Sequence, residues 1–169
     1  MNSAVTRHWQ SIRRIVNMDW KRVFVTVGST TFPELVEAVL SPEVIESLCQ
    51  LGVMELCVQH GKDGELFRQA SEGQTRLAIR GFDYSHSIEG EMKEADLIIS
   101  HAGIFVLVSS DLAGSGSLLE ALHLGKSIIA VPNASLMDNH QVELASALSD
   151  QGYILHSSLR WTSLRRQVT

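Results

Sequence analysis

At residues 22–30 the chain reads RVFVTVGST, an apolar, β-branched run that ends in a glycine and two small hydroxyl residues. Such a run predicts a buried strand over residues 22–27, with a tight turn at Gly28. Similar short runs predict further strands at residues 53–58, 77–81, 96–100 and 127–131, and a last short one at 153–155.

Proline and glycine mark the helices between these strands. Pro33 opens one helix, and Pro42 opens a second helix that Gly52 ends. Further helices are predicted over residues 87–95, 115–124 and 138–149. Strands that alternate with helices predict an α/β fold, a Rossmann-like parallel sheet with helices on both faces.

Composition bounds the class of protein. The 169 residues suffice for one domain, and 44% hydrophobic with 20% charged residues is typical of a soluble globular chain. The net charge of −5 argues against a nucleic-acid-binding surface, and no apolar run reaches the roughly 18 residues that cross a bilayer. Cys49 and Cys57 are predicted to be buried thiols rather than a disulfide or metal site, which favours a cytosolic protein.

The charge pattern divides the chain into three parts: a basic extension at 1–21, a domain at 22–156 and a basic tail at 157–169. Apolar residues recur at helical spacing in the extension, which is typical of an amphipathic helix that lies on an anionic membrane. They are Val5, Trp9, Ile12, Val16 and Trp20. The alternatives are an extension outside the fold, or initiation at Met18.

Small and polar residues follow several predicted strands. Gly28, Ser29 and Thr30 follow the first strand, and His101 and Gly103 follow the fourth. Parallel sheets bind ligands at the carboxyl ends of their strands, so these residues predict a ligand site. Taken singly, Gly28 is equally well explained as a turn residue, and His101 as a hydrogen-bonded structural histidine.

A second group of candidates lies later in the chain. Gly116 and Ser117 belong to a Gly-Ser-Gly-Ser run that opens a predicted helix, where free amides and the helix dipole favour an anion such as a diphosphate. Glu120 follows one turn later and suits the hydroxyls of a ribose. Asn139, His140 and Gln141 open the next helix and suit sugar hydroxyls. Helix capping and a solvated surface charge are the alternatives.

Four segments resemble a known family, the catalytic subunits of the UDP-N-acetylglucosamine (UDP-GlcNAc) transferase of dolichol-linked oligosaccharide synthesis. These segments are VFVTVGST at 23–30, ADLIISHAG at 95–103, GSLLEAL at 116–122 and LMDNHQVELA at 136–145. The resemblance covers about residues 21–156, and the last segment is its most specific motif. It implies a glycosyltransferase family 28 C-terminal domain, that is, one Rossmann-like half of a GT-B enzyme.

The resemblance also implies an activity. GlcNAc would pass from UDP-GlcNAc to GlcNAc-diphosphodolichol on the cytosolic face of the endoplasmic reticulum, in a heterodimer with a membrane-anchored, acceptor-binding subunit. Gly28, Ser29 and Thr30 would lie near the diphosphate, and Glu120 would hold the ribose. No metal or other cofactor is expected, and the general base is assigned to no residue of this chain.

One departure from the family pattern stands out. The apolar residues 104–114 separate SHAG from SGS, which the family joins almost directly. They represent either an intron translated in frame or a genuine loop that reshapes the site. A genuine loop would favour a non-catalytic nucleotide-sugar-binding module. A nucleotide-cofactor oxidoreductase is disfavoured because Gly-x-Gly-x-x-Gly is absent, and a fragment of a single-chain transferase is a further alternative.

Overall fold

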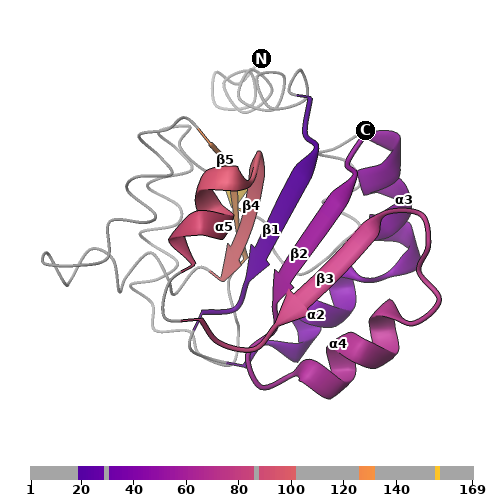
Figure 1. Ribbon diagram of the computed structural model, residues 1–169, viewed down its shortest axis with the longest axis vertical. Helices are drawn as coiled ribbons and strands as arrows, with labels where there is room; N and C mark the ends of the chain where they lie inside the picture. Colours follow the sequence, from indigo (N-terminus) through magenta and orange to yellow (C-terminus); the bar gives the residue numbers. More distant parts are fainter. Residues whose placement is uncertain (1–18, 29–30, 86–87, 102–125, 132–154, 157–169) are drawn as a thin grey trace, which may run out of the picture.

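The computed structural model describes residues 19–28, 31–85, 88–101, 126–131 and 155–156. Within them, strands and helices alternate around one parallel sheet (Figure 1). The strands are β1 (Arg22–Thr26), β2 (Glu55–Gln59), β3 (Ala78–Phe82), β4 (Leu97–His101), β5 (Ser127–Val131) and β6 (Leu155–His156). The helices are α2 (Pro33–Val39), α3 (Pro42–Gln50), α4 (Gly64–Ser71) and α5 (Glu89–Glu94).

The sheet has the order β3-β2-β1-β4-β5-β6, and every neighbouring pair is parallel. Chain order therefore reverses between β1 and β4, as it does in doubly wound nucleotide-binding folds. The α/β, Rossmann-like prediction is confirmed. The six predicted strands are all present; β5 has the predicted bounds, and the bounds of the others differ from the predicted ones by at most two residues.

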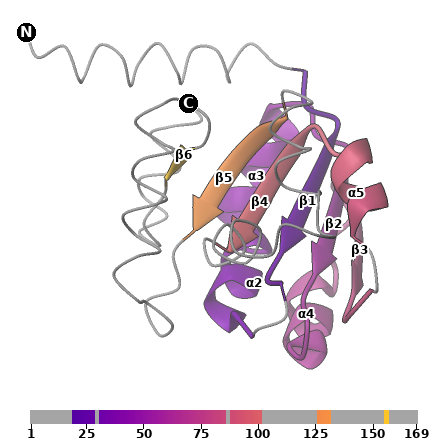
Figure 2. The ribbon, with the colours of Figure 1, turned by 90° about the vertical axis from the view of Figure 1, so that its left-hand side faces the viewer.

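Alternation along β1 sends its side chains to two different layers. Val23, Val25 and Val27 enter a core that contains residues of α2 and α3, such as Leu35 and Ile45. Phe24 points to the opposite face, where its ring stacks on Phe82 of β3 with centroids 6.3 Å apart. Figures 1 and 2 show α2 and α3 on one side of the sheet and α5 on the other. Both faces of this central strand are thus buried, which explains its continuous apolar sequence.

The proline-opened helices are confirmed, and Gly52, with φ of 84°, ends the second of them. Helix α4 is absent from the prediction, since its sequence GELFRQAS has few apolar residues and none of its side chains is fully buried. It packs beside α2 and β3 through half-buried residues such as Leu66 and Phe67. Low overall hydrophobicity, despite an amphipathic pattern, thus conceals a helix that tertiary contacts stabilise.

Trp20 differs from its predicted role on a membrane helix. It is buried among the residues of the core and lies outside any helix, two residues before β1. The rest of the proposed amphipathic helix, residues 1–18, lies outside the described residues, as does the tail 157–169. Cys57 is buried as predicted, whereas Cys49 is only half-buried.

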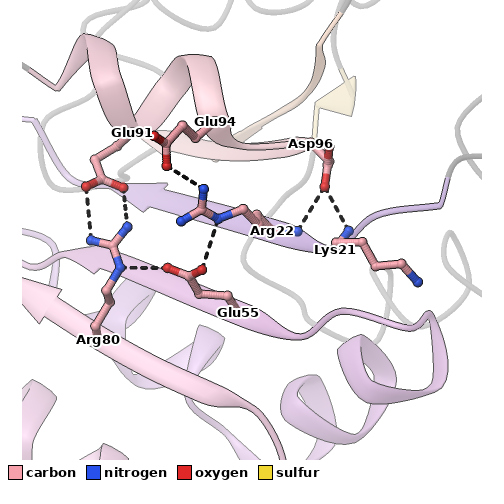
Figure 3. A network of polar contacts seen from close by, with 7 residues as sticks. All are labelled: Lys21, Arg22, Glu55, Arg80, Glu91, Glu94 and Asp96. Atoms are coloured by element: carbon pink, nitrogen blue, oxygen red, sulfur yellow. Dashed lines mark hydrogen bonds and ion pairs between the residues drawn. The ribbon is translucent and has the colours of Figure 1, made fainter.

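Ion pairs rather than apolar contacts attach much of α5 to the sheet (Figure 3). Arg80 of β3 donates two hydrogen bonds to Glu91 of α5, at 3.0 and 2.5 Å, and one to Glu55 of β2 at 2.7 Å. Arg22 of β1 joins Glu55, at 2.9 Å, to Glu94. The hydrogen bonds from Arg80 are the main cause that lowers the pKa of both Glu55 and Glu91. Of the helix's own side chains, Met92 is the one that is fully buried.

Candidate functional site

The carboxyl edge of β1 and β4 is the topological switch point of the sheet, the place where doubly wound folds bind ligands. Gly28 lies two residues beyond the end of β1, and His101 is the last residue of β4. Thr26 pairs with Ser100 in the register of these two strands, so both predicted site residues stand at the same edge. The structure thus brings Gly28 and His101 together.

Gly28 adopts φ of 71°, a left-handed conformation that a side chain would strain. Its peptide groups are bonded on both sides. The N–H donates to the hydroxyl oxygen of Thr26 at 3.1 Å, and the carbonyl accepts from Nε2 of Gln59 at 2.9 Å. The Thr26 hydroxyl in turn donates to Oε1 of Gln59. The turn at Gly28 is therefore fixed by two buried side chains of β1 and β2.

A second contact fixes the far end of the loop that follows β1. Asp63 accepts a hydrogen bond from the backbone N–H of Phe32 at 3.0 Å, directly before α2. Asp63 is the N-cap residue of α4, yet its side chain makes no capping bond to that helix. Sequence reasoning missed Thr26, Gln59 and Asp63. The signal for the first two was a polar residue at the end of an otherwise apolar strand.

His60 directly follows the end of β2. Its ring is buried and packs on Phe67 with centroids 4.9 Å apart, while Nδ1 lies 3.0 Å from the carbonyl oxygen of Gly61. A Cβ on Gly64 would approach Cε1 of this ring to 3.1 Å. The surroundings of His60 are those of a structural histidine.

The remaining predicted site residues are outside the part of the chain that the structure describes. They are Ser29, Thr30, Gly103, Gly116, Ser117, Glu120, Asn139, His140 and Gln141. Residues 104–114 are outside it as well.

A small pocket occurs at a different place, beneath α5. It is lined by Arg22, Glu55, Arg80 and Glu91, whose charges are already paired, together with Cys57. It lies toward the amino-terminal half of β1 and β2 and does not include the switch point. Among the described residues, no cluster of three or more His, Cys, Asp or Glu residues suits a metal ion. No helix in these ranges is long and apolar enough to span a membrane.

The family model of the glycosyltransferase family 28 C-terminal domain matches residues 22–169. The chain belongs to this family. It is 40% identical over 136 residues to the UDP-N-acetylglucosamine transferase subunit ALG13 of Yarrowia lipolytica, covering 80% of this chain and 64% of the relative. With the mouse protein of the same name it shares 36% identity, over 88% of this chain and 12% of that protein. This chain thus covers less than two thirds of the length of each of these two relatives.

Solved structures agree on the family 28 fold. An NMR solution structure of ALG13 matches with a TM-score of 0.61 at 31% identity, covering 86% of this chain and 82% of that one. The crystal structure of MurG from Acinetobacter baumannii matches with a TM-score of 0.60 at 20% identity, covering 95% of this chain and 45% of that one. The family 28 domain therefore has the fold of about half of MurG, which confirms the expected half of a GT-B glycosyltransferase.

Proposed function

We propose that this chain binds UDP-GlcNAc and transfers GlcNAc to GlcNAc-diphosphodolichol, in complex with a membrane-anchored, acceptor-binding subunit. The observation that carries the proposal is the fixed turn at Gly28, at the switch point of a family 28 domain. Relatives named as UDP-N-acetylglucosamine transferase subunits support the donor, and the word subunit supports a partner. The complex would work on the cytosolic face of the endoplasmic reticulum.

The donor would lie across the carboxyl edge of β1 and β4. Because the N–H of Gly28 is already bonded to Thr26, Gly28 would shape the loop rather than donate to phosphate. Ser29 and Thr30 would then face the diphosphate, with His101 and Gly103 on the neighbouring strand end. Gly116 and Ser117 would add amides at a helix start, where they stabilise charge on the departing UDP.

The uridine and sugar would be held by later residues. Glu120 would accept hydrogen bonds from the ribose hydroxyls, and Asn139, His140 and Gln141 would contact GlcNAc. No metal is required in this scheme, because amides and a helix dipole can stabilise the leaving diphosphate. A general base must still deprotonate the acceptor hydroxyl, and no residue of this chain is assigned that role.

Transfer of labelled GlcNAc to a GlcNAc-diphospholipid tests the proposal. The chain is assayed with and without the co-expressed membrane subunit, alongside a variant that lacks residues 104–114 and a Glu120→Gln variant. We expect transfer only with the partner and a loss of donor affinity in Glu120→Gln. Donor binding without transfer in both length variants would instead support a non-catalytic nucleotide-sugar-binding module, the alternative that the 104–114 segment favours.

A further inference from the structure

Two side chains from the end of β2 and the loop after it hold the loop that follows β1, one at each end. Gln59 bonds the carbonyl of Gly28 at 2.9 Å, and Asp63 bonds the N–H of Phe32 at 3.0 Å. Each contact bridges 31 residues of sequence. These two contacts, or anchors, fix the backbone of Gly28 after the end of β1 and of Phe32 at the start of α2.

The first anchor, at Gly28, is formed by the polar side chains of Thr26 and Gln59, at positions where apolar side chains would pack in the core equally well. Thr26 is fully buried and Gln59 nearly so. A valine has the shape of threonine and needs no hydrogen-bond partner, so burial alone does not call for a hydroxyl at position 26. What the hydroxyl adds is its bond to the N–H of Gly28 and its bond to Oε1 of Gln59.

In the second anchor, Asp63 bonds to a residue outside the helix that it would ordinarily cap. Aspartate at an N-cap ordinarily accepts a hydrogen bond from a backbone N–H of its own helix, which stabilises that helix. Asp63 makes no such bond in α4, and its carboxylate reaches across to Phe32 instead. Phe32 is itself fully buried at the start of α2, so its position is set by packing as well.

We propose that Thr26 with Gln59, and Asp63, are positioning residues that hold Gly28 and Phe32, on either side of positions 29–30, for binding of the donor diphosphate. They act through the backbone of Gly28 and Phe32 and need not touch the ligand. This inference rests on the proposed function, because that function supplies the ligand. It predicts that loss of either anchor weakens donor binding specifically.

Isosteric variants test the proposal in the complex with the partner subunit. Thr26→Val removes the hydroxyl, and Thr26→Ser restores it. Asp63→Ala removes the acceptor, and Asp63→Asn keeps an oxygen for the N–H of Phe32. Val25→Ala, on the opposite face of β1 from Thr26, is the control that costs stability while leaving the hydrogen-bonding groups of both anchors unchanged. The readouts are the Kd for UDP and for UDP-GlcNAc, and the donor KM, acceptor KM and kcat.

We expect Thr26→Val and Asp63→Ala each to raise the donor KM and both Kd values about tenfold, with the acceptor KM unchanged. Thr26→Ser and Asp63→Asn should recover most of the loss. A purely destabilising change lowers the active fraction, and so kcat, without moving the donor KM, which is the result expected for Val25→Ala. Donor binding that Thr26→Val and Asp63→Ala leave unaltered would overturn this inference alone. If the unsubstituted complex bound no donor, the proposed function would fail, and the inference with it.

Discussion

The carboxylate of Asp96 accepts hydrogen bonds from the backbone N–H groups of both Lys21 and Arg22, the latter at 2.9 Å. It thereby joins the entry of β1 to the start of β4 across 74 residues of sequence (Figure 3). These two strands flank the switch point, so the contact aligns the pair whose opposite ends carry the candidate site.

Replacing Asp96 by alanine should lower the free energy of unfolding by about 1–3 kcal/mol, because two amides lose a charged acceptor. Urea unfolding followed by circular dichroism measures the change. Asp19→Ala is the matched control. The ion pair of Asp19 with Lys21 is largely exposed, so its loss should cost less than about 0.5 kcal/mol. Equal effects of the two substitutions would contradict the role given to Asp96.

Gly81 of β3 has no room for a side chain. A Cβ there would lie 2.5 Å from Cζ of Phe67 on α4. Gly81→Ala should therefore destabilise the protein by about 1–3 kcal/mol through forced repacking of α4. Adding Phe67→Leu to the same chain should recover part of the loss, and a thermal melt of the single and double variants measures this.

Gly90 of α5 provides the contrasting glycine. Nothing lies within 4 Å of a Cβ built there. Gly90→Ala should stabilise the protein by about 0.5–1 kcal/mol, because alanine has the higher helix propensity. A destabilised Gly90→Ala protein would show that α5 is packed more tightly than the structure indicates.

The ion network of α5 predicts a loss of stability in acid. The folded-state pKa values of Glu55 and Glu91 are held below the ordinary 4.5, first by hydrogen bonds from Arg80. Their contribution is therefore fully present above pH 4.5 and is lost as the pH falls through the folded-state values. Glu91→Gln should cost up to about 1 kcal/mol at pH 7, and its difference from the parent should vanish in acid.

The control for Glu91→Gln is Glu37→Gln, which alters an exposed carboxylate on α2. Urea unfolding of both variants between pH 7 and 3 separates a local ion-pair effect from a general effect of net charge. A constant difference between Glu91→Gln and the parent across this range would refute the pH argument.

Cys57 should be unreactive in the folded protein. Burial, the largest cause, raises the pKa of its thiol from 9.0 to about 12, so at pH 8 the reactive thiolate is roughly a thousandfold rarer than in an ordinary cysteine. Half-buried Cys49 should react first with a disulfide reagent. Single Cys→Ser variants show which thiol gives each phase of the labelling reaction. Both thiols should react rapidly in denaturant. Fast native labelling in the Cys49→Ser protein would contradict the buried placement.

Local patterns in the sequence predicted much of the fold. Apolar β-branched runs identified all six strands, and the prolines at 33 and 42 identified the starts of two helices. Alternation of these elements identified the fold class. Helix α4 was missed because it is short and mostly polar and none of its side chains is fully buried, so its few apolar residues did not stand out in the sequence.

Prediction of the candidate site from the sequence likewise succeeded for some residues and failed for others. The sequence by itself determined that Gly28 ends a buried strand in a turn and that His101 ends another, because burial and turn formation are properties of short segments. It left open which strands are neighbours and what Thr26, Gln59 and Asp63 do. Most of those answers depend on contacts between residues far apart in the sequence, such as Gln59 with Gly28 and Asp96 with Arg22. A buried polar side chain acquires a role only through its partner, and only the tertiary structure brings that partner within hydrogen-bonding distance.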